Sequence, residues 1–424
     1  MKYTPAGEKV DREIQKYVDI AVEEILKKVP DALSIIIYGG YGRGEGSYFL
    51  KKGKVMPVND FDTYVITEKP AEPEVLDAAA DNFAKRLGIK GIPFKSFDKT
   101  WNFDQNFYLD LKCLTTSQLK KLFPMIRYYE LRNATNVVYG KDTRTFIPDF
   151  KKSDVPLSEG ARILMNRMTH LVEYFSTEGK HDPLTLSFFC TKAFIDSCTA
   201  LSLLSKRYEP SYLRRMDNFV KNYEKDFPEL AKKLPDLPKK VKKYTEWKMK
   251  INGLPEKNIE KLWLDARHNI TEVAKYFVGR MLGKRIETLD ELSDAIASMG
   301  KTYYRPYAEH FSKTNLKIRN NLITSVLSLG IHWYFKVLYF LRILKNKRPY
   351  LRIFTNKSAP DLQIMAAMVH ILHSLDRHMK IDSKNFSKGL NELRKVYPAK
   401  AIKWEDLSQE YADAYVLFYL QKIV

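Results

Sequence analysis

The chain has 424 residues, of which 45% are hydrophobic and 13% aromatic, so it holds enough apolar material for a packed core and for two or three domains. Its three cysteines, Cys113, Cys190 and Cys198, are too few for a disulfide framework and lack the close Cys/His pairs of tetrahedral zinc sites, which excludes both classes. The net charge of +20 is unevenly distributed along the chain. Residues 1–150 carry 23 Lys and Arg against 21 Asp and Glu, a net charge of +2, whereas residues 151–424 carry 48 Lys and Arg against 30 Asp and Glu, a net charge of +18.

The composition also bears on compartment and partners. The first twenty residues are interrupted by charged side chains and lack the apolar stretch of a secretory signal, which together with the sparse cysteines predicts a cytoplasmic protein. The basic second half favours polyanionic partners such as RNA, nucleotides, anionic lipids or acidic glycans. A lysine-rich solvated surface would give the same composition.

The first part of the chain alternates between helical and strand patterns. Apolar side chains recur at helical spacing over residues 8–28, and a second helix is predicted at residues 71–88. Strands are predicted at residues 34–38, 61–66 and 106–114. We therefore expect a small mixed sheet with helices packed against it.

The rest of the chain shows helical patterns alone. The predicted helices lie at about residues 157–176, 183–205, 210–225, 258–281, 286–298, 314–344, 360–378, 384–396 and 404–422. A Pro- and Lys-rich stretch, residues 234–243, is predicted to be a linker or an exposed basic loop. The fold class is thus α+β, with a first domain over 1–150, a helical domain over 151–240 that packs on the cleft of the first, and a basic helical domain over 241–424.

A glycine-rich turn follows the first predicted strand. Gly39 and Gly40 open it, and it continues through further glycines to Ser47. Glycines after a buried strand let the backbone turn sharply and bring its N–H groups close to phosphate oxygens. Arg43 and Ser47, within the same turn, are candidates to reach a triphosphate.

Three aspartates are placed to bind metal. Asp60 and Asp62 lie two apart on a predicted strand, so their carboxylates point to one side while Phe61 turns into the core. Asp110 on the third strand is the candidate third ligand and the acceptor of a proton from an attacking hydroxyl, with Lys112 beside it to offset phosphate charge. Carboxylate oxygens suit Mg²⁺, or Mn²⁺ in its place, and two such ions can stabilise the attacking and leaving oxygens of an in-line displacement.

In this order, the Gly-Gly turn, the Asp-x-Asp pair and the lone later Asp resemble the DNA polymerase beta superfamily of nucleotidyltransferases. The turn at residues 39–45 is most similar to that of the PII uridylyltransferases, while residues 129–142 and the helical half look more like aminoglycoside and minimal nucleotidyltransferases. The resemblance covers residues 30–145. It implies a catalytic domain at 1–150, with metal held by Asp60, Asp62 and Asp110 and nucleotide bound by Gly39, Gly40, Arg43, Ser47 and Lys112.

The spacing departs from that superfamily. Twenty positions separate Gly40 from Asp60, more than is usual there. Residues 51–54 predict the turn of an inserted hairpin or loop. The insertion leaves the positions of Arg43 and Ser47 less determined than those of the aspartates.

Two later patterns have ordinary structural interpretations. Arg305 and His310 form an Arg-x4-His pattern like that of helical ribonucleases, but Pro306 predicts a helix start, and we interpret the pattern as chance. The apolar run 322–344 contains Lys336 and other basic residues, so we predict a buried helix rather than a transmembrane segment, with attachment to a membrane surface as the alternative.

These features predict a magnesium-dependent enzyme that moves a nucleoside monophosphate from an NTP, ATP by default, to an acceptor hydroxyl and releases pyrophosphate. A small molecule or a protein is favoured as the acceptor, because no glycine and aromatic pattern of RNA-binding strands is present. The basic half would suit an anionic acceptor. The alternatives are transfer to RNA 3′ ends, an inactive nucleotide-binding protein, and a non-catalytic RNA- or membrane-binding scaffold. The oligomeric state stays open.

Overall fold

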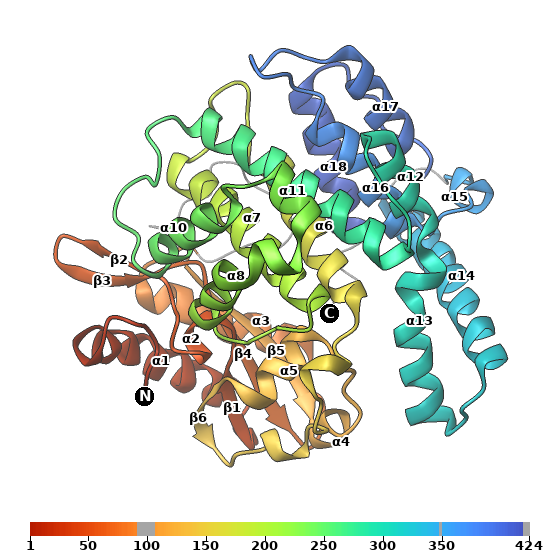
Figure 1. The fold of residues 1–424 in the computed structure, drawn as a ribbon. Coiled ribbons are helices and arrows are strands. Elements are labelled where there is room, and N and C mark those ends of the chain that lie inside the picture. The colour runs from red at the N-terminus through yellow and green to blue at the C-terminus, as the bar shows by residue number, and fades with distance from the viewer. Residues whose placement is uncertain (91–106, 347–349, 419–424) are drawn as a thin grey trace.

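The computed structural model describes residues 1–90, 107–346 and 350–418, and it places a small α/β unit beneath a large helical half (Figure 1). The predicted α+β class is confirmed, because every named strand belongs to the first 140 residues and the described chain after them is helical. Residue 106 and residues 419–422, which the sequence assigns to a strand and to a helix, lie outside the described residues.

The central sheet is mixed, as the sequence predicts, and has the strand order β5-β4-β1-β6. Strand β1 (Ser34–Ile37) lies antiparallel to β4 (Asp60–Thr67) and to β6 (Asn136–Gly140). Strand β4 lies parallel to β5 (Tyr108–Thr115). The parallel pair matters for the site, because it brings matching positions of β4 and β5 side by side.

Helices cover both faces of this sheet. On one face, α1 (Glu8–Lys28) and α3 (Pro73–Leu87) bury their apolar stripes against a cluster that includes the fully buried Phe61. On the other face, α4 (Thr116–Leu119) and α5 (Ile126–Asn133) close a smaller apolar cluster. The sheet therefore has a rigid support on either side.

The insertion between the glycine turn and β4 is a hairpin, which confirms the prediction. Strands β2 (Tyr48–Lys51) and β3 (Lys54–Pro57) pair antiparallel. Lys52 and Gly53 between them have φ values of 47° and 79°, and positive φ at both central residues is the geometry of a tight hairpin turn. The N–H of Ile251 donates to the carbonyl of Tyr48 (3.0 Å), which ties the hairpin to the helical half.

One hydrophobic core runs through the helical half and includes residues from Ala161 to Phe418. The division of this half near residue 240 stays a prediction. The helices are α6 (Leu157–Glu173), α7 (Pro183–Leu204), α8 (Tyr212–Asp226), α9 (Pro228–Lys233), α10 (Leu237–Met249), α11 (Ile259–Leu282), α12 (Leu289–Ser298), α13 (Gly300–Phe311), α14 (Asn321–Asn346), α15 (Arg352–Thr355), α16 (Pro360–Leu372), α17 (Ser383–Leu393) and α18 (Trp404–Phe418).

The prediction of a linker or loop at residues 234–243 is wrong, because most of this stretch begins α10. Pro238 lies in the first helical turn, where its missing N–H would have had no partner in the helix. Val241 and Tyr244 are buried, and the lysines between them occupy the outer face. The stretch is therefore an amphipathic helix with a basic outer surface.

The helix start expected at Pro306 is also wrong, because Pro306 lies inside α13. Arg305 forms an ion pair with Glu309 (Nε to Oε1, 2.8 Å). The Nε2 atom of His310 lies 2.9 Å from the carbonyl oxygen of Lys121. Arg305 and His310 thus contact separate local partners.

Helix α14 contradicts the prediction that its apolar run is buried. Two helices of the described chain are long and apolar enough to cross a membrane by length and composition, α7 and α14. In the most apolar 18-residue stretch of each helix, 89% of α7 is buried, whereas only 22% of α14 is buried. The apolar character of α7 is thus explained by the core, and that of α14 is not.

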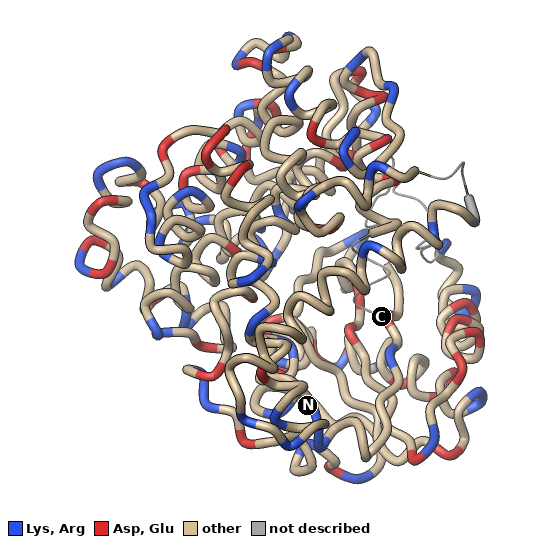
Figure 2. The backbone as a smooth tube through the Cα atoms, turned by 90° about the vertical axis from the view of Figure 1, so that its right-hand side faces the viewer, with Lys and Arg blue, Asp and Glu red and all other residues tan. Residues whose placement is uncertain are grey.

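Charged residues are mixed over the helical half. In the view of Figure 2, Lys and Arg stand beside Asp and Glu along many of its helices. The sequence-based suggestion that the basic surplus attracts an anionic partner stays a prediction.

Candidate active site

Three aspartates converge at one edge of the sheet, as the strand pattern predicts. Asp60 and Asp62 lie on β4, and the register of the parallel pair places Asp62 directly beside Asp110 on β5. One carboxylate oxygen from each of the three lies within 4.8 Å of the others, and all three side chains are partly exposed. A group of this kind could hold a divalent cation.

Local structure holds Asp60 in place. Phe61, between the two acids, is fully buried, so the alternation along β4 directs both carboxylates to the opposite side. The hydroxyl of Tyr108 donates to Asp60 Oδ2 (2.9 Å), and the Asn59 amide donates to the other oxygen. Asn59 has φ 72°, a left-handed conformation that asparagine tolerates better than most residues. Asp60 is therefore oriented by Tyr108 at the start of β5 and by Asn59 just before β4.

The crowded acids suit a cation. Burial, followed by repulsion from Asp110, raises the pKa of Asp60. Burial and then repulsion from Asp60 and Asp110 raise the pKa of Asp62 well above its ordinary value. A divalent ion would relieve this repulsion, and three carboxylates are the hard oxygen donors that Mg²⁺ and Mn²⁺ take. The residues present thus fit the predicted metal without selecting between the two ions.

The glycine turn forms the next wall of the site. It is a single helical turn, α2 (Gly39–Gly42), that directly follows β1. Gly39 has φ +65°, and a Cβ atom there would lie 2.0 Å from Asp62 Oδ2. The N–H of Tyr38 donates to the carbonyl of Asp62 (2.9 Å). Only glycine fits at residue 39, because the turn lies directly against a candidate metal ligand.

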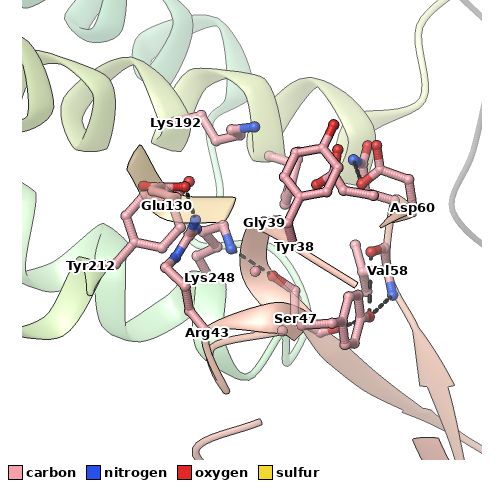
Figure 3. Close-up of a pocket in the computed structure, with 16 residues that line it drawn as sticks. Tyr38, Gly39, Arg43, Ser47, Val58, Asp60, Glu130, Lys192, Tyr212 and Lys248 are labelled. Atoms are coloured by element: carbon pink, nitrogen blue, oxygen red, sulfur yellow. Dashed lines mark hydrogen bonds and ion pairs between the residues drawn. The ribbon is translucent and has the colours of Figure 1, made fainter. Parts of the chain in front are cut away.

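A pocket of about 260 Å³ opens between this turn, the start of β4 and helices of the other half of the chain (Figure 3). Asp60, Asp62 and Gly40 line it on the sheet side, and Lys192 of α7 and Lys248 of α10 line it on the helical side. Figure 3 shows Lys192 and Lys248 reaching in from the helical side, with the hydrogen bond from Lys248 to Ser47. The pocket is therefore built from both halves of the molecule.

The two pocket lysines have no ion-pair partner within the described part of the chain. Lys248 donates to the hydroxyl of Ser47 (3.0 Å) and lies over the Tyr212 ring (4.9 Å to its centroid). Lys192 lies over the Phe188 ring (5.4 Å). Lys248 is buried and Lys192 is partly exposed. Unpaired ammonium groups in such places are uncommon, and a polyphosphate would supply the charge that they lack.

Burial also weakens the basicity of both lysines. The pKa of Lys248 is lowered to about 7, first by burial and then by repulsion from Lys192 and Arg43. The pKa of Lys192 is lowered to about 8 by burial and by repulsion from Arg167. Near neutral pH, an anionic ligand would therefore draw protons onto this wall of the pocket.

Arg43 lines the pocket, but its guanidinium is already paired. It contacts the carboxylate of Glu130 and lies 3.6 Å from Glu45 (Nε to Oε2), with the Tyr212 ring 4.5 Å away. Glu130 also accepts a hydrogen bond from the hydroxyl of Tyr208 (2.6 Å). These contacts join the glycine turn to the helical half. Direct contact between Arg43 and a nucleotide stays a prediction.

The other predicted nucleotide contacts lie at different depths. Ser47 is buried and holds Lys248, so it reaches the pocket through that lysine. Lys112 lies 3.1 Å from Asp110 (Nζ to Oδ2) and is partly exposed at the edge of the sheet. Both roles in nucleotide binding stay predictions.

The sequence interpretation missed Lys192, Lys248 and Glu130. A signal existed for Lys192, which is one of two charged residues in the otherwise apolar α7. Lys248 had no such signal, because it belongs to a lysine-rich helix in which each lysine resembles the next.

No protein-family model and no curated protein sequence matches this chain. Among solved structures, the chain is similar to a spectinomycin adenyltransferase from Enterococcus faecialis, solved with ATP and spectinomycin. The identity is 12%, the match covers 62% of this chain and 99% of that chain, and the TM-score is 0.37. Because this likeness is remote, the function proposed below rests on the geometry of the site. The resemblance of the turn to PII uridylyltransferases stays a prediction.

Proposed function

We propose that this protein transfers a nucleoside monophosphate from an NTP to an acceptor hydroxyl and releases pyrophosphate. The observation that carries the proposal is the convergence of Asp60, Asp62 and Asp110, of which the first two line one pocket together with the glycine turn. Lys192 and Lys248 line the same pocket on the helical side. Such a transfer requires acids that hold a metal and cations that bind phosphate, and these lie on opposite sides of the site.

The triphosphate occupies the space between these two walls. Its phosphates lie against the N–H groups of the turn at Gly39 and Gly40, and Lys192 and Lys248 contact them from the helices. Mg²⁺, or Mn²⁺, held by the aspartates would neutralise phosphate charge and stabilise the attacking and leaving oxygens. ATP is the default nucleotide.

The chemical step needs a group that removes a proton from the acceptor. The acceptor oxygen forms a bond to the α-phosphorus, the bond from that phosphorus to the bridging oxygen breaks, and pyrophosphate leaves with the electron pair. Asp110 takes the hydroxyl proton, and Lys112, 3.1 Å from it, offsets negative charge at this edge. The acceptor enters at the partly exposed side of the aspartates, and a small molecule or a protein is favoured over an RNA 3′ end.

The test is to find the labelled product. The purified chain is incubated with each of the four α-labelled NTPs, Mg²⁺ and a cell extract, and protein, RNA and small molecules are then separated. Label should enter one fraction with one preferred NTP, and Asp62→Asn protein and a chelator should each abolish it. Incorporation that is equal with the Asp62→Asn protein would overturn the proposal. Salt-sensitive RNA binding that needs no Mg²⁺ would favour the scaffold alternative instead.

A further inference from the structure

Helix α14 exposes many of its apolar side chains, although several of its buried side chains are polar. Thr324, Ser328 and Lys336 are buried, together with Tyr339 and Ile343. The buried Lys336 donates to the carbonyl of Asn356. A helix of a globular protein ordinarily turns its apolar face to the core. The exposed apolar side chains of α14 indicate that its outer face has a partner of its own.

The exposed side chains form one continuous stripe, which we call the α14 stripe. They lie three or four residues apart, and their exposed fractions run from 73% at Leu322 to 40% at Leu344. The stripe consists of Leu322, Val326, Leu329, Trp333, Val337, Leu341 and Leu344. Side chains at this spacing share one face of a helix, and the 22 steps from Leu322 to Leu344 extend about 33 Å. An exposed apolar surface of this size marks an interaction site.

The segment of the chain that carries the stripe is basic. Between Glu309 and Asp361 the chain has ten Lys and Arg and no Asp or Glu, although its average of 51 acids in 424 residues would place about six there. Lys313, Lys317 and Arg319, in the connection between α13 and α14, are exposed. The partner of this face must therefore accept apolar side chains and carry negative charge.

We propose that the α14 stripe and its basic flanks dock on a membrane surface that contains anionic lipids. Apolar side chains would enter the boundary of the acyl chains, and the lysines and arginines would meet the lipid headgroups. Trp333 and the neighbouring exposed Tyr334 suit the interfacial layer, where aromatic rings with a polar edge collect. The helix lies in the plane of the surface, because its other side packs on the protein.

The arrangement in space agrees with this docking. Figure 1 shows α13 and α14 side by side at the edge of the helical half, where α14 forms the outer layer. A second copy of the chain would bring the same basic flanks against each other, which is unfavourable. Nucleic acid would use the charges but would leave the apolar stripe in water. An anionic membrane satisfies both properties of the face.

The first test is flotation of the full-length protein with vesicles of phosphatidylcholine alone and of phosphatidylcholine with 30% phosphatidylserine. We expect binding to the anionic vesicles, and the variant Leu329→Glu with Val337→Glu should bind them at least tenfold more weakly. The matched control, Leu254→Glu with Ile402→Glu, changes two exposed apolar residues away from α14 and should bind within twofold of wild type. Unchanged thermal unfolding shows that each variant is folded.

The second test reports insertion directly. Brominated lipids should quench Trp333 fluorescence, so Trp333→Phe should abolish most of the quenching, whereas Trp247→Phe should keep it. Three results would overturn the proposal: no binding to anionic vesicles, binding that the stripe variant retains, or a wild-type dimer in solution that the stripe variant turns into a monomer while neither binds vesicles. The docking face lies outside the pocket, so nucleotidyl transfer by the stripe variant is expected to be normal, and each proposal can fail without the other.

Discussion

Replacing Gly39 by alanine tests whether the glycine turn positions the metal site. The added methyl group would lie 2.0 Å from Asp62 Oδ2, and Cβ contacts under 3.0 Å are essentially never seen, so the carboxylate oxygen must move by about 1 Å. Gly39 also has φ +65°, which adds about 1–2 kcal/mol of backbone strain for alanine.

Gly88 provides a matched control for this strain. Its φ is +67°, and nothing lies within 4 Å of a Cβ atom added there. Gly39→Ala and Gly88→Ala therefore carry the same backbone penalty, and only the first displaces a candidate metal ligand. Their difference isolates the effect of moving Asp62.

A misplacement of about 1 Å at a reacting centre can lower a rate by about 10²-fold. We expect Gly39→Ala to lose about 10²-fold in pyrophosphate release and to bind Mn²⁺ more weakly in a calorimetric titration, while Gly88→Ala retains both. Thermal unfolding of the two variants establishes that they are comparably folded. Turnover by folded Gly39→Ala within about threefold of wild type would refute the argument that this turn positions Asp62.

Three further predictions concern the same site. Asp62→Asn should weaken Mg²⁺-dependent binding of a non-hydrolysable NTP as well as turnover. Asp110→Asn should keep NTP binding within a few-fold of wild type and cut turnover by about 10²-fold or more. Full turnover by Asp110→Asn would place the proton acceptor elsewhere. Because the pKa of Lys248 is lowered to about 7 and a triphosphate binds its ammonium form, nucleotide affinity should fall as the pH rises above 7. Lys248→Met should flatten this dependence. Equal slopes of affinity against pH for wild type and Lys248→Met in calorimetry would contradict the contact. Glu130→Ala leaves the buried Arg43 without its shortest ion pair and should destabilise the fold by about 3–5 kcal/mol in denaturant unfolding, and a loss under about 1 kcal/mol would show that the pair is not structural.

Much of the sheet side of the site could be predicted from local sequence. The alternation around Phe61 places Asp60 and Asp62 on one side of a strand, because a strand has a period of two whatever it packs against. Residues 51–54 also predict a hairpin from local sequence, because the positive φ at Lys52 and Gly53 is a property of the turn itself. Such features depend on neighbours along the chain.

Only the tertiary structure decided which helices complete the pocket and which face water. Lys192 and Lys248 belong to α7 and α10, and they meet at the glycine turn only because those helices pack there. Helix α14 has the apolar composition of a buried helix, yet its apolar side is exposed because no other part of the described chain covers it. Local periodicity states which side chains share a face, but the partner of that face is set by contacts between distant residues, and these do not appear in the spacing of the sequence.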